Sequence, residues 1–151
     1  LRTIVDTTLD LMDHNITQVS ADVVLSRSKQ PLLLKGNRMR LEQVATNILR
    51  NALDAVEGRS TRQINISMGR EDADIWFEVA DTGHGLGDRS LEDLREPFAT
   101  TRESGKGMGL GLTISAGIVS DHGGTITAHD RISGGAVFRI TLPEEPEGQI
   151  A

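Results

Sequence analysis

Residues 37–56 read Asn37-Arg-Met-Arg-Leu-Glu-Gln-Val-Ala-Thr-Asn47-Ile-Leu-Arg-Asn51-Ala-Leu-Asp-Ala-Val56. Apolar residues recur in this stretch at the i, i+3, i+4, i+7 spacing of a helix with one buried face. They are Leu41, Val44, Ala45, Ile48, Leu49, Ala52, Leu53 and Val56. Asn37 suits the N-cap position and Gly58 suits the stop. The stretch therefore predicts a helix over about 38–57.

The flanking sequence predicts two more main helices and a sheet. Helices are expected at 1–14, with Asn15 as the stop, and at 110–122. Strands are expected at 19–25, 31–35, 64–68, 74–81, 125–130 and 136–142, and a short helix near 90–95. Because these elements are mixed rather than strictly alternating, we expect an α+β fold. It is a two-layer α/β sandwich with three main helices on one face of a mixed, mainly antiparallel sheet.

The composition limits the class of protein. At 151 residues the chain fits one domain, expected at 1–143, with a flexible acidic tail at 144–151. It has no cysteine, which excludes disulfides, a thiolate nucleophile and sulfur-ligated zinc. The net charge of −6 argues against nucleic acid as a partner, and no apolar run is long enough to span a membrane. Any anion must therefore be bound by a local site.

A polar stripe accompanies the helix at 38–57. Asn47, Asn51 and Asp54 lie at i, i+4 and i+7, beside the apolar face. A solvated helix surface is the plain alternative. Asparagine, however, costs a helix up to about 0.7 kcal/mol relative to alanine, so two of them in mid-helix are typical of a site. An amide oxygen suits a Mg²⁺ ion that keeps most of its waters and bridges phosphates.

A second motif, Asp81-Thr-Gly-His-Gly85, follows the strand at 74–81. Strand parity places Asp81 on the face of the strand's apolar residues, and so toward the helices if that face is buried. A carboxylate there would accept a hydrogen bond from a donor such as the exocyclic amine of adenine. Gly83 and Gly85 would let the chain approach a planar base. A strand-ending turn is the alternative.

A third motif, Gly105-Lys-Gly-Met-Gly-Leu-Gly111-Leu112, leads directly into the helix at 110–122. Backbone N–H groups and the helix dipole at such a start bind phosphates, and Arg102 and Lys106 supply positive charge. The spacing matches neither a Walker A loop nor a dinucleotide fingerprint. A flexible linker is the alternative, although linkers seldom run straight into an apolar helix.

Taken together, these motifs resemble the sequence boxes of sensor histidine kinases. Asn47-Ile-Leu-Arg-Asn51-Ala-Leu-Asp-Ala55 resembles the N box, Asp81-Thr-Gly-His-Gly85 the first glycine box, Glu96-Pro-Phe98 the F box and Gly107-Met-Gly-Leu-Gly111-Leu the second glycine box. Gly134-Gly-Ala-Val-Phe138 is similar to the closing strand of the same domain. The order and spacing are those of the family over nearly the whole chain, and the details are similar to nitrogen-regulatory and dicarboxylate-sensing kinases.

The resemblance implies the Bergerat fold of the superfamily that includes type II topoisomerases, mismatch-repair proteins and heat-shock chaperones. It implies Mg²⁺ and ATP bound under a lid at about 86–107, with Asp81 on adenine, Asn51 on the metal ion, and Asn47 and Arg102 as catalytic residues on the phosphate side. The other implied nucleotide-binding residues are Asp54, Gly83, Gly85, Phe98, Thr100, Thr101, Lys106, Gly107, Met108, Gly109, Leu110, Gly111 and Leu112.

Two departures refine the expected activity. Hydrolytic relatives carry a glutamate at the position of Asn47, and an amide is no general base, so transfer of the phosphoryl group is favoured over hydrolysis. No His-Glu/Asp-x-x-x-Pro segment occurs, so the phosphoacceptor histidine is expected on another domain. The four histidines, His14, His84, His122 and His129, are expected to be structural or surface residues.

The resemblance also implies partners and a location. We expect the domain to act on the dimerisation and phosphoacceptor hairpin of its own kinase, and indirectly on a response regulator. We expect a monomer in isolation, without direct membrane contact, in the cytoplasmic portion of a membrane-bound sensor. Three alternatives remain open: a serine kinase of the anti-sigma type, a non-catalytic nucleotide-sensing module and a generic ATPase.

Overall fold

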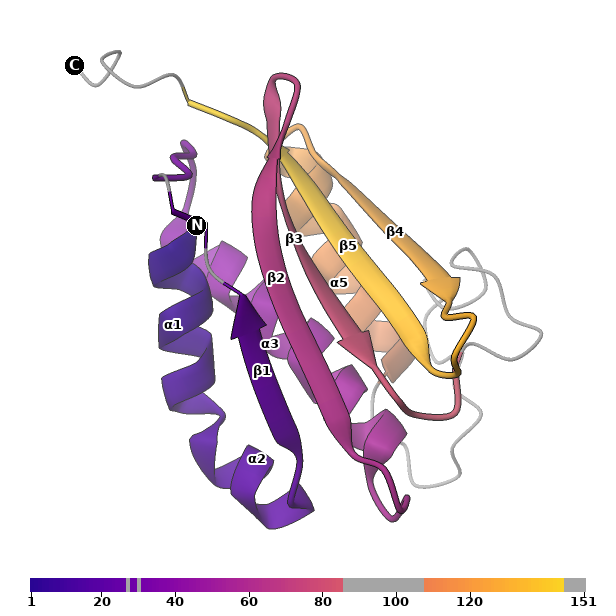
Figure 1. The fold of residues 1–151 in the computed structure, drawn as a ribbon. Coiled ribbons are helices and arrows are strands. Elements are labelled where there is room, and N and C mark those ends of the chain that lie inside the picture. The colour runs from indigo at the N-terminus through magenta and orange to yellow at the C-terminus, as the bar shows by residue number, and fades with distance from the viewer. Residues whose placement is uncertain (27, 30, 86–107, 146–151) are drawn as a thin grey trace.

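The computed structural model describes residues 1–26, 28–29, 31–85 and 108–145, and within them five strands form one sheet (Figure 1). The strands are β1 (Asp22–Ser26), β2 (Gln63–Glu71), β3 (Asp74–Asp81), β4 (Thr125–Asp130) and β5 (Ala136–Pro143). Their order across the sheet is β1-β2-β3-β5-β4. The β1–β2 pair is parallel and the other three pairs are antiparallel, so the predicted mixed, mainly antiparallel sheet is confirmed.

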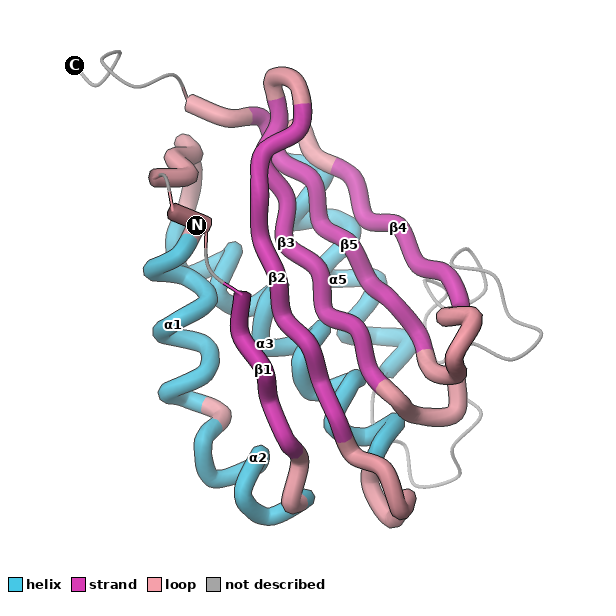
Figure 2. Tube along the Cα trace, in the orientation of Figure 1, coloured by secondary structure: helices cyan, strands magenta, loops and turns pink. Residues whose placement is uncertain are grey.

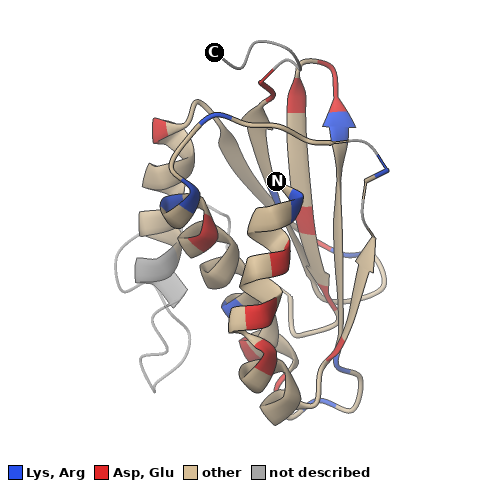
Figure 3. Cartoon of the chain, turned by 90° about the vertical axis from the view of Figure 1, so that its left-hand side faces the viewer, with Lys and Arg blue, Asp and Glu red and all other residues tan. Residues whose placement is uncertain are grey.

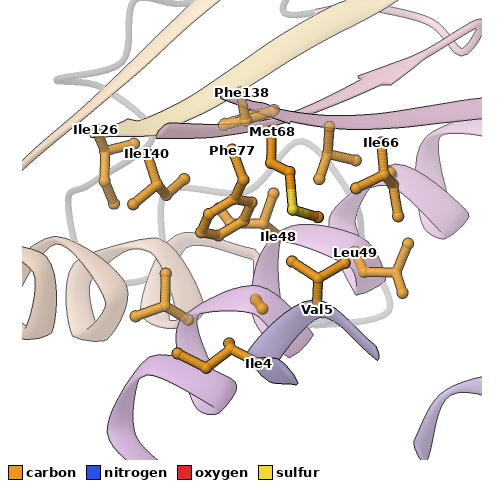
Figure 4. Close-up of a cluster of buried hydrophobic side chains, with 14 of the residues drawn as sticks. Ile4, Val5, Ile48, Leu49, Ile66, Met68, Phe77, Ile126, Phe138 and Ile140 are labelled. Carbon is orange, nitrogen blue, oxygen red and sulfur yellow. The ribbon is translucent and has the colours of Figure 1, made fainter. Parts of the chain in front are cut away.

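Helices cover one face of this sheet (Figure 2). They are α1 (Arg2–Leu11), α2 (Asp13–Val19), α3 (Arg38–Val56) and α5 (Met108–Asp121). Side chains from α1, α3 and the inner face of the sheet form one buried cluster, in which Ile4, Val5, Ile48 and Phe77 are labelled (Figure 4). The two-layer α/β sandwich predicted from the sequence is therefore the observed architecture.

The long helix α3 lies at the centre of the helical layer. The Asn37 side chain caps it by accepting a hydrogen bond from the Arg40 N–H (3.1 Å). His122, just beyond α5, also reaches this end, because its Nε2 lies 3.0 Å from the Asn37 N–H and its Nδ1 lies 2.8 Å from the Ile118 carbonyl. The predicted bounds of α3 are correct to within one residue, and His122 has the predicted structural role.

The N-terminal helix differs from the prediction. The helical path is interrupted at the buried Met12 and resumes in α2, which ends at Ser20 in the left-handed conformation (φ 60°). A stop at Asn15 and a strand from residue 19 are therefore wrong. Ile16 and Val19 explain the difference: they are three residues apart, and both pack against the core, so they extend the helical pattern.

The strand predicted at 31–35 is also wrong, because these residues form no strand. Leu32 is buried, so the apolar run packs in the core although it forms no strand of the sheet. The carbonyls here bond elsewhere: Pro31 accepts from the Arg70 guanidinium (3.1 Å), and Leu33 accepts from the Glu145 N–H (2.8 Å). Glu144 likewise donates to the Ala73 carbonyl (3.0 Å), so defined contacts continue past residue 143.

Acidic residues mark the outer side of the N-terminal helices (Figure 3). Asp6, Asp10 and Asp13 are exposed or half-buried there, in keeping with the net charge of −6. In the part of the chain that the structure describes, none of the helices has the length and apolarity needed to cross a bilayer.

Candidate functional site

Asp81 is the last residue of β3 and faces the helical layer. Half-buried and buried residues alternate along the strand, and Asp81 falls on the buried face with 1% exposure. Its Oδ1 accepts hydrogen bonds from the backbone N–H of Gly83 (2.8 Å) and of Ala136 (3.3 Å). Among the described residues no hydrogen bond reaches Oδ2. The predicted direction of Asp81 is thus the observed one, with one oxygen left to accept a further donor.

The charge of Asp81 is set by opposing effects. Burial raises the pKa of its carboxyl above the ordinary value, because a carboxylate loses hydration in the interior. The backbone hydrogen bonds from Gly83 and Ala136 lower the pKa, and so do the positive charges of His84 and Arg131. The carboxylate therefore depends on these donors and charges to remain ionised.

Gly83 brings the end of β3 against α3. A Cβ atom at Gly83 would overlap the carbonyl and the Cβ of Ala55, so only glycine permits this approach. Asn51 lies one helical turn before Ala55, on the same face of α3. The contact therefore brings the end of β3, which carries Asp81, against the face of α3 that carries Asn51.

Asn51 is buried, with 6% exposure, so the solvated-surface alternative does not apply to it. Its Nδ2 is buried, and no hydrogen-bond partner for it is found in the described parts of the chain. Leaving a buried polar group unsatisfied costs about 1–3 kcal/mol, and such groups are rare in folded proteins. An N–H donor in this state is suited to an acceptor oxygen of a bound ligand, whereas the other amide atom, Oδ1, is the one that could contact a cation.

Asn47 lies one turn before Asn51 and joins α3 to α5. Its Nδ2 donates a hydrogen bond to the Oγ of Ser115, a fully buried residue of α5 (3.1 Å). Asp54 is half-buried further along the same stripe. Of the stripe predicted from the sequence, Asn47 is therefore the member that lies at the contact between α3 and α5.

The glycine-rich motif is described only in part. Met108, Gly109, Leu110 and Gly111 form the first turn of α5, and Leu112 after them is buried in the core. The remaining predicted residues of the lid and phosphate side lie outside the described residues; they are Phe98, Thr100, Thr101, Arg102, Lys106 and Gly107.

The structure adds four residues that the sequence did not reveal. Ala136 donates to the Asp81 carboxylate, Ser115 holds Asn47, and Arg131 donates from Nη1 to the Asp81 carbonyl (2.9 Å). Gly135 packs so closely that a Cβ would overlap that carbonyl. Gly134-Gly135, just before a strand, was the local signal of a close approach.

Comparison with known proteins identifies the domain. The model of the family described as histidine kinase-, DNA gyrase B- and HSP90-like ATPase matches residues 36–146. The chain belongs to this ATPase family. The catalytic domain of the histidine kinase ThkA superposes with a TM-score of 0.83 at 28% identity, over 97% of this chain and 94% of that domain.

Relatives within the ATPase family are sensor proteins. Sensor protein FixL of Bradyrhizobium diazoefficiens is 40% identical over 116 residues, which are 76% of this chain and 23% of FixL. Nitrogen regulation protein NtrY of Azorhizobium caulinodans is 41% identical over 131 residues, 82% of this chain and 17% of NtrY. The chain thus spans less than a quarter of either relative.

These findings confirm the predicted family, the fold and the assignment to histidine-kinase catalytic domains of two-component signalling. ATP as the nucleotide is confirmed at the level of the ATPase family. ThkA has also been solved in complex with the response regulator TrrA. Among the described residues no group of three His, Cys, Asp or Glu residues is placed to hold a metal ion. The roles of single residues stay predictions.

Proposed function

We propose that this domain binds Mg-ATP and donates the γ-phosphoryl group to a histidine on a separate dimerisation and phosphoacceptor domain. In this transfer the bond from the γ-phosphorus to the bridging oxygen breaks, a bond to the histidine nitrogen forms, and ADP leaves. The kinase would act in the cytoplasmic portion of a membrane-bound sensor, with a response regulator as the next acceptor.

One observation carries the proposal: the Gly83–Ala55 contact joins the strand end that carries a buried carboxylate, Asp81, to the helix face that carries a buried amide, Asn51, whose Nδ2 has no partner among the described residues. The free Oδ2 of Asp81 suits the exocyclic amine of adenine. The unsatisfied Nδ2 of Asn51 suits a phosphate oxygen or a metal-bound water, and its Oδ1 suits a Mg²⁺ ion that is held chiefly by phosphates and water, because such an ion needs only one or two protein ligands. The residues present therefore fit a Mg-nucleotide.

The remaining roles follow the path from adenine to phosphate. Asn47 and Asp54 would line the phosphate side of α3, while the N–H groups of the first turn of α5 would hold the phosphate oxygens. Arg102 and Lys106 would add positive charge from the lid. Mg²⁺, when bound, supplies charge neutralisation on the phosphates. Asn47 offers no general base, which supports transfer over hydrolysis.

Phosphotransfer tests the activity. The domain is incubated with ATP labelled at the γ-phosphate and with the histidine-bearing hairpin of its own kinase. We expect acid-labile label on the hairpin, and no label when the hairpin histidine is replaced by alanine. Acid-stable label would overturn the proposal in favour of serine phosphorylation. The absence of any transfer, despite tight ADP binding, would overturn it in favour of a nucleotide-sensing module.

Asp81→Asn tests the adenine contact. An amide NH₂ in place of Oδ2 would face the adenine amine donor to donor, which costs about 1–3 kcal/mol, or roughly 5- to 160-fold in ATP affinity. Calorimetric titration measures this loss. Asp74→Asn, at the other end of β3, is the matched control and should bind ATP as the unmodified domain does. Equal affinity of the two variants would show that Asp81 does not contact adenine.

A further inference from the structure

The β4–β5 turn, residues 131–135, lies at the end of β3, where both are visible at the same end of the sheet (Figure 1). The turn is closed by two backbone hydrogen bonds, from Arg131 N–H to the Gly135 carbonyl (2.8 Å) and from Gly134 N–H to the Arg131 carbonyl (3.1 Å). These bonds fix the direction in which Arg131 leaves the turn. No motif in the sequence assigns this turn a role in the site.

Three contacts join the turn to Asp81. The Arg131 guanidinium donates to the Asp81 carbonyl (2.9 Å), the Ala136 N–H donates to Oδ1 (3.3 Å), and Gly135 (φ 96°) packs directly on the carbonyl. The backbone and the carboxylate of Asp81 are therefore both held by residues 50 or more positions away in the chain. Such a long-range support is typical of a side chain that must be oriented accurately.

The residue before the β4–β5 turn, Asp130, also lies close to Gly85, the last residue of the Asp81–Gly85 motif. A Cβ at Gly85 (φ 77°) would lie 2.7 Å from the Oδ1 of Asp130, the residue before the turn. Asp130 and Arg131 thus contact the two ends of one short loop. The position of that loop relative to α3 depends on these contacts as much as on Gly83.

We propose that the β4–β5 turn positions the nucleotide-binding carboxylate, with Arg131 as the residue that fixes Asp81 and supplies the positive charge beside it. This inference rests on the proposed adenine contact of Asp81. In the part of the chain that the structure describes, the charges of Arg131 and His84 act on Asp81. Arg131 stays positive over the whole physiological range. Arg131 is therefore the permanent support for the ionised carboxylate.

The test compares Arg131→Gln with Arg131→Lys. ATP affinity is measured by calorimetry from acidic to neutral pH, in a His84→Gln background in which His84 no longer acts on Asp81. We expect Arg131→Gln to weaken ATP binding about three- to tenfold at neutral pH. We also expect the pH at which affinity is half lost to move upward. Arg131→Lys should keep that pH near its original place, because it restores the charge.

A purely structural role would give a different pattern. Inosine triphosphate, which lacks the exocyclic amine, should be affected less than ATP by Arg131→Gln. Arg139→Gln makes the same charge change on β5, where Arg139 pairs with Glu78 (2.7 Å), and should leave both affinities unchanged. Equal losses for the two nucleotides, or an unmoved pH midpoint, would overturn the inference.

A failure of this inference can be distinguished from a failure of the proposed function. If Asp81→Asn does not weaken ATP binding, the adenine contact itself fails. If Asp81→Asn weakens binding and Arg131→Gln does not, only the role of the turn fails. Thermal unfolding of each variant confirms that the fold is retained.

Discussion

Asp81 and Asn51 are both buried polar side chains, and they differ in how the protein satisfies them. Asp81, 1% exposed, accepts two backbone N–H groups, and its carbonyl accepts a third donor from Arg131. Asn51, 6% exposed, has a buried Nδ2 without a partner among the described residues. Within the described residues, Asp81 is held by three hydrogen bonds and keeps one oxygen for a further donor, whereas the amide nitrogen of Asn51 is bonded by none.

This difference fits the chemistry that the two sides are proposed to perform. A planar base is recognised by hydrogen bonds of fixed direction, so an acceptor for it benefits from rigid support. A Mg²⁺ ion brings its own waters and phosphate ligands, so its protein ligand needs no other partner. We therefore expect a substitution that pushes the β4–β5 turn away from Asp81 to disturb the fold, and a substitution at Asn51 to disturb ligand binding.

The largest expected effect is on folding, from Gly135→Ala. Its φ of 96° strains any other residue by about 1–3 kcal/mol, and overlap of the new Cβ with the Asp81 carbonyl adds about 1–3 kcal/mol. Gly134→Ala is the matched control, because its φ of 100° brings the same strain but no atom lies within 4 Å of its Cβ. Urea unfolding should show the greater loss at Gly135. Equal losses at the two glycines would mean that the turn is not tightly packed on Asp81.

Asn51→Leu should weaken ligand binding without destabilising the fold. Removing a metal ligand should weaken Mg-ATP binding about 10- to 100-fold, whereas removing an unsatisfied amide should leave the free energy of unfolding unchanged or raise it. Calorimetry with and without Mg²⁺ measures the first effect, and urea unfolding measures the second. Asn65→Leu is the control, since the Asn65 amide oxygen accepts from Gln63 (3.1 Å) on the other face of the sheet. A loss of stability at Asn51 would contradict the comparison.

The parts of this site that could be predicted from the sequence are those with a local signal. The period of apolar residues gave the bounds of α3, and strand parity gave the direction of Asp81. The support of Asp81 could not be predicted, because Arg131 and Ala136 lie 50 and 55 residues away and no period links them to it. The bond from Asn47 to Ser115 spans 68 residues and was missed for the same reason.

The wrong strand at 31–35 has a different cause. A short apolar run predicts burial, and burial alone does not distinguish a strand from a packed loop. Leu32 is buried as the run predicts, but the neighbouring carbonyls of Pro31 and Leu33 are bonded by the Arg70 side chain and the Glu145 N–H. Hydrogen-bond partners that are distant in the chain therefore hold this segment as a loop rather than a strand, and the sequence of the run does not reveal them.

The bond between Asn47 and Ser115 belongs to neither side of the comparison, because it joins the two helices beneath the phosphate side. Ser115→Ala removes the hydroxyl that accepts from Asn47, so we expect a loss of about 0.5–1.5 kcal/mol in the free energy of unfolding. Ser120→Ala, at an exposed position of the same helix, should cost less. Urea unfolding compares them, and equal small changes would show that the bond contributes nothing.

At neutral pH, Asp81→Asn is expected to change the free energy of unfolding less than the other substitutions do. The amide oxygen can still accept from Gly83 and Ala136, and the buried charge is gone, so stability should equal or exceed that of the unmodified domain.

The pH dependence of the free energy of unfolding tests the direction of this effect. Burial raises the pKa of Asp81 in the folded state, so the folded protein binds the proton more tightly than the unfolded chain does. Stability therefore falls as pH rises from the unfolded value of 3.8 through the raised folded value, and it is level above that. The Asn variant lacks this fall, so its advantage should grow across that window and vanish below it. Urea unfolding at a series of pH values measures the difference, and an advantage that shrinks as pH rises would mean that the hydrogen bonds and positive charges around Asp81 outweigh its burial.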